Sequence, residues 1–277
     1  GTMFNAVNDT VNIASLSANT AYEFYVRDSC GVGDVSTWVG PYSFTTLCNA
    51  TTTFPYLEDF STFPLSCWNT ATGGTPSTGP TTYGTSSWEE DGFGNVGTTG
   101  GVKINLYSNT IQDWLITAEY DLSTGGPYQA EFDFGVFVWG SSDDSTGTAP
   151  STLGSDDTVQ MLATIDDGAT WLTLATVDDS YVTSSGGDHI VIDLTAFAGA
   201  TVRFAVWASE GSVDDSEDND IMIDNFQISE LTTCPVPKPN VADIDLCVPG
   251  ITTIAATSGD AIFNYNTAGL ITSAGES

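Results

Sequence analysis

Short runs in which apolar and polar residues alternate, each cut by Gly, Asp, Ser or Pro, most constrain what this chain can fold into. Two clear runs lie at 129–139 and 201–208, where Phe and Val recur at every second position. A period of two places alternate side chains on one face of a strand, and regularly spaced short strands are typical of sandwiches. No segment keeps a helical period over three turns. The sequence therefore predicts an all-β fold.

The charge balance is extreme, with 36 Asp and Glu against 4 Lys and Arg, a net charge of −32. Nucleic acid and anionic membranes attract basic surfaces, so neither is an expected partner. No apolar stretch reaches the roughly 18 residues that a membrane span needs, so no direct membrane insertion is expected. Divalent cations and neutral surfaces remain as plausible binding partners for so acidic a chain. At roughly 100–200 residues per domain, the 277 residues suggest two or three domains.

The five cysteines indicate an oxidising environment and no zinc site. None forms a CxxC pair, and His189 is the only histidine that could assist a metal. Sparse cysteines in a β chain rich in Thr, Ser and Gly fit the cell exterior, so we expect an extracellular, cell-surface protein. The partner of Cys30 stays open, and Cys234 could pair with Cys247.

Residues 1–47 contain a run in which Tyr22, Phe24 and Val26 share one face, followed by a second strand near 42–46. The run resembles the last half of a fibronectin type III domain, in which a Tyr hydroxyl closes a corner, with Ala18 in place of the usual Pro. Half a sandwich leaves open edges and half a core. The chain is therefore expected to be a portion of something longer.

Residues 48–230 carry a series of short motifs in a fixed order. They are 54–60 (FPYLEDF), Cys67-Trp68, Asp113-Trp114, Asp157-Thr158-Val159, 166–171 (DDGATW), 192–194 with Gly199, and 223–226 (IDNF). This region resembles a MAM-like or cleaved-adhesin-type jelly roll, of the kind met in type IX-secreted surface adhesins of the gliding-motility type. The resemblance implies a Cys48–Cys67 disulfide and calcium between the first and last strands. Residues 231–277 look like a proline-rich linker and the start of an immunoglobulin-like domain.

Three acids fall on otherwise apolar strand faces, which predicts a metal. Glu58 shares a face with Tyr56 and Phe60, Asp157 with Val159, Met161 and Ile165, and Asp224 with Met222, Phe226 and Ile228. A buried, unpaired carboxylate costs roughly several kcal/mol, and this domain offers only Lys103 and Arg203 as cations. Structural Ca2+ would resolve the deficit. Within the acidic loop 214–220, Asp220 is best placed to join the metal, because it opens the last strand. The alternative is that each acid sits at a strand end and faces water.

Four aromatic residues near loop-rich edges are candidates for ligand binding: Trp88, Phe93, Tyr107 and Trp139. Such rings can stack on sugars, with Asp, Asn or calcium contacting the hydroxyls; the alternative is core packing. The sequence shows few residue patterns that are typical of catalysis: His189 has no nucleophile motif nearby, and no phosphate loop occurs. We expect no catalytic residues and no enzyme activity.

These observations lead to two functional readings. The first is a structural and adhesive segment of a large secreted protein, built from calcium-stabilised β modules. The second is a carbohydrate-binding module of a secreted polysaccharide hydrolase or peptidase. A surface glycan, or an abiotic or cell surface, is the partner they imply. The ligand and the oligomeric state stay open.

Overall fold

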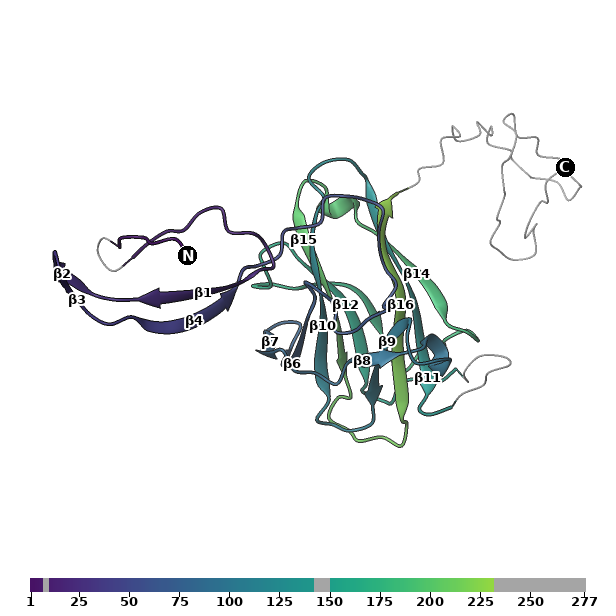
Figure 1. Ribbon diagram of the computed structural model, residues 1–277. Coiled ribbons are helices and arrows are strands. Elements are labelled where there is room, and N and C mark those ends of the chain that lie inside the picture. The colour runs from purple at the N-terminus through teal and green to yellow at the C-terminus, as the bar shows by residue number, and fades with distance from the viewer. Residues whose placement is uncertain (7–9, 142–149, 232–277) are drawn as a thin grey trace, which may run out of the picture. The chain divides into compact units, whose positions relative to one another are not determined.

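A computed structural model describes residues 1–6, 10–141 and 150–231 of the chain (Figure 1). Nearly all regular structure there is β, as predicted, with two short 3-10 turns, η1 (Phe93–Asn95) and η2 (Thr195–Phe197). The immunoglobulin-like segment expected at 231–277, with Cys234 and Cys247, lies outside the described residues apart from its first residue. Among the described residues, no helix is long and apolar enough to cross a membrane.

Two antiparallel sheets build the central sandwich (Figure 1). The first, here the β10 sheet, has the order β13 (Leu172–Val177), β12 (Thr158–Thr164), β15 (Thr201–Ser209), β10 (Gln112–Asp121), β6 (Asn69–Thr75), β7 (Gly79–Tyr83). The second, the β16 sheet, has the order β14 (Asp188–Asp193), β11 (Tyr128–Val138), β16 (Asn219–Glu230), β9 (Gly101–Leu106), β8 (Glu89–Asp91), and β5 (Tyr56–Glu58) also pairs with β16. The predicted jelly-roll sandwich is confirmed.

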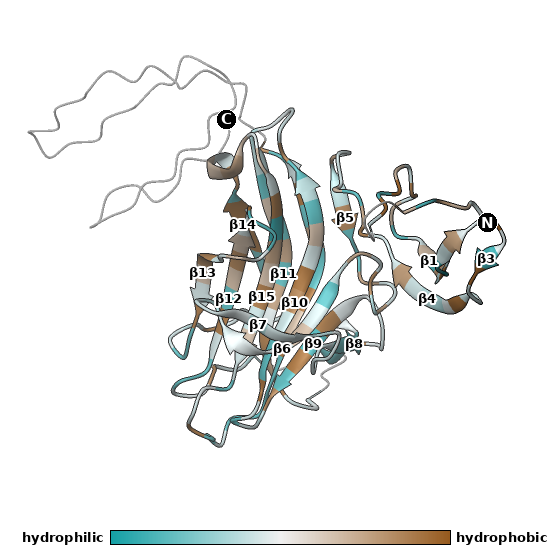
Figure 2. Cartoon of the chain, turned by 90° about the vertical axis from the view of Figure 1, so that its left-hand side faces the viewer, coloured by the Kyte–Doolittle hydropathy of each residue, from teal (hydrophilic) through white to brown (hydrophobic). Residues whose placement is uncertain are grey.

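The core lies between these sheets and follows the period-two pattern. Phe132, Phe134 and Val136 on β11 are at most 5% exposed, and Val202 and Phe204 on β15 are fully buried. Figure 2 shows brown, hydrophobic stretches within β10 and β11. Alternate residues of each strand therefore pack inward, as the sequence predicts.

The outer face of the β10 sheet carries a second apolar cluster that includes Trp114, Trp171 and Trp207. The hairpin β6–β7 covers it, because the Trp114 indole donates to the Gly73 carbonyl at 2.9 Å and the Trp207 indole to the Gly74 carbonyl at 3.2 Å. The rings of Trp114 and Trp171 lie 5.5 Å apart. This sheet is thus buried on both faces near its centre.

The turn between β12 and β13 has the structural role expected for residues 164–171. The Asp166 carboxylate accepts hydrogen bonds from the Thr170 backbone N–H at 2.9 Å and from the Thr164 hydroxyl at 2.7 Å. Asp167 and Gly168 both have positive φ, as a tight hairpin requires. Trp171 packs against this turn, since its ring lies 3.5 Å from the position that a Cβ at Gly168 would take.

The first 47 residues contain β1 (Ala21–Val26) paired with β4 (Val39–Thr45), and a small hairpin of β2 (Ser29–Gly31) and β3 (Asp34–Val35). The Ser17 backbone N–H donates to the Tyr22 hydroxyl at 2.8 Å, which is the corner that the fibronectin resemblance implied. The rings of Tyr22 and Phe44 stack at 5.7 Å. The domain boundary at 47/48 remains an expectation.

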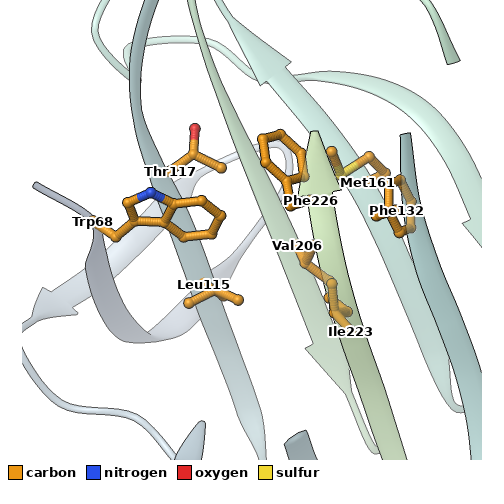
Figure 3. Close-up of a pocket in the computed structure, with 8 residues that line it drawn as sticks. All are labelled: Trp68, Leu115, Thr117, Phe132, Met161, Val206, Ile223 and Phe226. Carbon is orange, nitrogen blue, oxygen red and sulfur yellow. The ribbon is translucent and has the colours of Figure 1, made fainter. Parts of the chain in front are cut away.

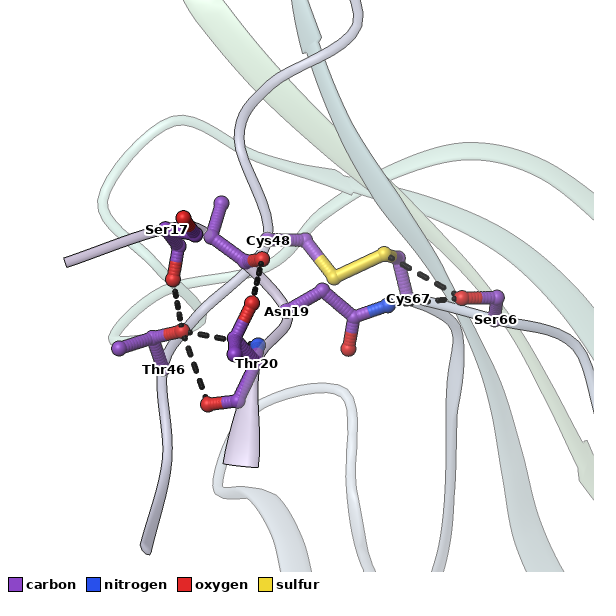
Figure 4. Close-up of a disulfide and its surroundings, with 8 residues drawn as sticks. Ser17, Asn19, Thr20, Thr46, Cys48, Ser66 and Cys67 are labelled. Atoms are coloured by element: carbon purple, nitrogen blue, oxygen red, sulfur yellow. Dashed lines mark hydrogen bonds between the residues drawn. A yellow bond between two sulfur atoms is a disulfide. The ribbon is translucent and has the colours of Figure 1, made fainter. Parts of the chain in front are cut away.

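A disulfide joins Cys48 to Cys67, as the resemblance to MAM-like domains implied (Figure 4). The chain that enters it is held by Thr46, whose hydroxyl donates to the Ser17 carbonyl at 2.6 Å and accepts from the Thr20 backbone N–H at 3.0 Å. Cys30 is an exposed free thiol within the described residues.

Candidate functional site

Of the four predicted ligand-binding aromatics, only two are more than half exposed. Trp88 is 4% exposed and belongs to the core, so core packing is the correct reading for it. Phe93 packs edge-on against Phe137, with ring centroids 5.7 Å apart. Tyr107 and Trp139 are each 57% exposed. The sequence pattern placed all four aromatic residues near the edges of strands. It could not show which of their rings are buried by other elements of the fold.

Tyr107 and Trp139 emerge at the same end of the β16 sheet. Tyr107 follows β9, and Trp139 follows β11. Leu106 of β9 and Val138 of β11 both pair with Asn219, the first residue of the strand between them. Two inter-strand spacings therefore separate the ends of β9 and β11, about 10 Å.

A surface hollow of about 290 Å³ lies beside Trp139 and is called the Trp139 hollow below. It is lined by Val138, Trp139, Ser151, Ser216, Glu217, Asp218 and Asn219. Two contacts shape it: the Trp139 backbone N–H donates to the Asp218 carbonyl at 2.9 Å, and the Asn219 amide donates to the Thr152 carbonyl at 2.9 Å. The hollow thus combines an exposed indole with hydroxyl and carboxylate groups.

The sequence pointed to Trp139 but not to the polar wall of this hollow. Residues 216–218 belong to the loop between β15 and β16, nearly eighty positions further along the chain. They reach Trp139 only because β11 and β16 are neighbours in the sheet. No local pattern carries that information.

A second cavity lies inside the core and is too small for a ligand (Figure 3). Its volume is about 10 Å³, roughly the space of one water molecule. Its walls come from both sheets: Trp68, Leu115, Thr117, Phe132, Met161, Val206, Ile223 and Phe226. It is a packing gap between side chains of the core.

The four predicted calcium ligands do not gather at one place. Asp157 immediately precedes β12 in the β10 sheet, whereas Glu58, Asp220 and Asp224 belong to strands of the β16 sheet. Burial first, and then the charges of Asp156, Asp215 and Glu217, raises the pKa of Asp157. Burial first, and then the charges of Asp133 and Asp59, raises the pKa of Asp224. Within the described ranges, no group of three or more His, Cys, Asp or Glu is arranged to hold a metal.

A β-bulge corrects the predicted face of Asp224. Glu131 pairs with Gln227 but Asp133 pairs with Asp224, so β16 contains one extra residue between these pairs. Asn225 takes a positive φ of 51° there. Before the bulge the odd-numbered residues Ile221 and Ile223 face the core, and after it the even-numbered residues Phe226 and Ile228 do. Asp224 shares a face with Met222, as predicted, but not with Phe226 or Ile228.

Protein groups already contact three of these acids. Glu58 accepts from the Phe60 backbone N–H at 3.1 Å and from the Tyr56 hydroxyl at 3.2 Å. Asp224 accepts from the Asn225 backbone N–H at 2.6 Å, while burial raises the pKa of Asp224 to about 6. Asp220 has no exposed surface and lies 3.9 Å from the Lys103 ammonium.

Asp220 resembles Asp157 in having buried carboxylate oxygens without a hydrogen-bond partner, but Asp220 lies near Lys103, whereas Asp157 lies near another acid, Glu210, which the sequence reading missed. Asp157 is 3% exposed and shares its inward face with Val159 and Met161, as predicted, whereas Ile165, predicted on the same face, is 64% exposed beyond the end of β12. Glu210 has no exposed surface, and neither of its carboxylate oxygens has a hydrogen-bond partner. Burial first, and then the charge of Asp157, raises the pKa of Glu210 to about 7. The period-two rule could have found Glu210, because it continues the inward series through Val206 and Ala208.

His189 does not enter a catalytic relay. Its Nδ1 lies 2.8 Å from an Asp133 carboxylate oxygen, and its Nε2 lies 3.2 Å from one of Glu131. Hydrogen bonding to Asp133 and Glu131 raises the pKa of His189 against a smaller opposing effect of burial. Both ring nitrogens therefore face carboxylates of β11 and not a Ser or Cys nucleophile.

No protein-family model and no curated protein matches this sequence. Among solved structures, the K1 cleaved adhesin domain of Lys-gingipain from Porphyromonas gingivalis W83 is similar at 14% identity and a TM-score of 0.40, over 65% of this chain and 99% of that one. A xylan-binding module, CBM15, is similar at 13% identity and a TM-score of 0.35, over 64% and 99%. A structure of carbohydrate-binding modules from the β-sandwich superfamily is similar at 10% identity and a TM-score of 0.35, over 76% and 74%. Similarities of this size show neither a shared ligand nor a shared activity.

Proposed function

We propose that this chain is a non-enzymatic adhesive segment of an extracellular protein, and that its central sandwich contacts a neutral glycan through the Trp139 hollow. One observation carries the proposal: an indole that is 57% exposed borders a hollow of about 290 Å³ whose other walls are mostly polar. An aromatic face stacks on the apolar face of a sugar ring, and hydroxyl, amide and carboxylate groups can bond the sugar hydroxyls.

The charges favour a neutral partner. The hollow contains Glu217 and Asp218, and the chain carries a net charge of −32. A polyanionic glycan would be repelled unless cations screened it. Tyr107, at the same end of the sheet, offers a second exposed ring for an extended chain. The Cys48–Cys67 disulfide suits an oxidising, extracellular location.

The test is affinity electrophoresis of the chain in gels that contain neutral polysaccharides, followed by a glycan array. We expect retardation by at least one neutral polysaccharide, and Trp139→Ala should weaken it by about 5- to 30-fold, since stacking contributes roughly 1–2 kcal/mol. Tyr83→Ala is the matched control, because Tyr83 is equally exposed, at 57%, but lies on β7.

The competing function is a spacer that separates other modules without binding a sugar. If the native chain binds no sugar in either affinity electrophoresis or the glycan array, the spacer function is favoured. Binding that survives Trp139→Ala but is lost in Tyr83→Ala would move the glycan site to the β10 sheet. A carbohydrate-binding module attached to a hydrolase would use the same hollow and give the same result as the adhesive segment.

A further inference from the structure

Two acidic side chains face each other at the end of the β10 sheet. The register that pairs Thr158 with Ser209 places Asp157 opposite Glu210, one position beyond the two strands. Opposed residues of an antiparallel pair have Cβ atoms about 4.5–5.5 Å apart, and like charges in such positions destabilise the pair. If both carboxylates are ionised, the folded chain needs a positive charge there.

The oxygens of these carboxylates are buried and largely unpaired. Neither oxygen of Glu210 has a hydrogen-bond partner, nor does Oδ1 of Asp157. Oδ2 of Asp157 accepts from the Gly154 backbone N–H at 2.9 Å. Three buried carboxylate oxygens thus have no donor, and a buried, unpaired carboxylate costs roughly several kcal/mol.

No protein cation among the described residues compensates them. Lys103 lies 2.7 Å from Asp91, and Arg203 lies 2.8 Å from Asp167 and 3.3 Å from Glu119. The described ion pairs include neither Asp157 nor Glu210. Within the part of the chain that the structure describes, the balancing charge can come only from solution, as a proton or a metal ion.

Gly154 allows a third carboxylate to approach. A Cβ at Gly154 would lie 2.7 Å from Oδ2 of Asp215 and 3.0 Å from Oδ2 of Asp157. Asp215 also accepts a hydrogen bond from the Ser155 backbone N–H. Because Gly154 has no side chain, the loop between β15 and β16 can pack closely against the segment that precedes β12.

We propose that Asp157 and Glu210 bind one calcium ion, with backbone carbonyls and water as its other ligands. Calcium takes six to eight oxygen ligands and accepts backbone carbonyls and water beside carboxylates, so this site needs only two acids and does not require a group of three, which the described residues do not offer. A proton is the competing solution, since the pKa of Glu210 is raised to about 7. A proton satisfies one oxygen, whereas a divalent ion contacts several and cancels both charges.

Calcium at this position would fasten the loop that forms one wall of the Trp139 hollow. The loop is already tied to the start of β12, because Asp156 accepts from the Ser212 backbone N–H at 2.8 Å. Ser216, Glu217 and Asp218 of the same loop line the hollow. The cation site does not depend on glycan recognition, and it can be tested without any sugar.

The experiment is thermal unfolding and calorimetric titration of the full chain at pH 7.5, after chelation, with CaCl2 or MgCl2. Calcium should bind with a stoichiometry of one at this site and raise Tm by about 5–10 °C at a free concentration near 100 times Kd. Magnesium should act more weakly, because it demands near-octahedral geometry. Glu210→Gln should remove the calcium shift and raise Tm in chelator, because a neutral amide replaces an unpaired charge. Asp157→Asn serves as the second variant.

Two controls decide which site is responsible. Asp179→Asn, which removes an exposed acid between β13 and β14, should leave the calcium shift unchanged. Glu58→Gln tests the position between the first and last strands. A native chain that shows no shift at millimolar calcium overturns the proposal. So does a shift that survives Glu210→Gln and Asp157→Asn but disappears in Glu58→Gln.

Discussion

Trp114 and Trp207 are directly opposed on β10 and β15, and each indole N–H donates to a glycine carbonyl of the β6–β7 hairpin. Gly73 and Gly74, whose carbonyls accept these bonds, are adjacent in the chain. One hairpin packed on the outer face of the β10 sheet therefore provides acceptors for both indole N–H groups. Buried indole N–H groups need such partners. Both glycines have a positive φ, 71° at Gly73 and 78° at Gly74, which explains why Gly is favoured at these positions of the hairpin.

Gly74→Ala should destabilise the sandwich strongly. A Cβ at Gly74 would lie 1.9 Å from the Gly79 carbonyl oxygen, and φ is +78°. We expect the free energy of unfolding to fall by about 3 kcal/mol or more, since both steric overlap and strain act. Urea unfolding and a red shift of tryptophan emission would show it. Gly84→Ala is the control: its φ is +82° but its Cβ would meet nothing within 4 Å, so only about 1–2 kcal/mol should be lost. Equal losses would contradict the steric argument.

Cys67→Ser should lower the free energy of unfolding by about 3 kcal/mol, because the 19-residue separation of the bridge restricts the unfolded chain. Urea unfolding with and without reductant measures it. The native chain should lose about the same amount on reduction, and the variant nothing more. Cys30→Ser, which removes the exposed free thiol, should be close to neutral. A bridge without stabilising effect would appear as superimposed native and variant curves.

His189 should titrate above its ordinary pKa of about 6.5, because Asp133 and Glu131 stabilise the imidazolium. A group whose folded pKa is raised contributes stability fully below its unfolded pKa and loses it as the pH rises through the folded pKa. The native chain should therefore lose a little stability above pH 6.5, an effect kept small by exposure of the ring. An NMR titration of the single histidine checks the pKa, and Asp133→Asn should lower it. A midpoint at or below 6.5 in the native chain would refute the contact.

The charges of Asp157 and Glu210 should be coupled. In chelator, Asp157→Asn and Glu210→Gln should each stabilise the chain, and the double variant should gain less than the sum of the two. Contacting residues typically show a coupling of about 0.5–3 kcal/mol. A double-mutant cycle by urea unfolding at pH 7.5 measures it. Strict additivity would show that the two carboxylates do not interact.

Period-two alternation was enough to predict the class of fold, the central strands at 129–139 and 201–208 and the inward position of Asp157. These properties depend on neighbouring residues, which the sequence displays directly. The same rule, carried two residues beyond Ala208, also points to Glu210. The resemblance supplied the Cys48–Cys67 pairing, which spacing alone left open.

The tertiary structure alone decided which of these residues meet. Strand order places Asp157 opposite Glu210, more than fifty residues away, and brings Ser216 to Trp139. One extra residue in β16 turned Asp224 away from the core, although its local pattern looked inward. Burial of Trp88 likewise depends on its packing in the core. Alternation is a local property of a strand, whereas strand pairing, strand register and the burial of side chains by other elements arise from contacts between distant segments. These contacts decide which charged groups and which aromatic rings lie close together.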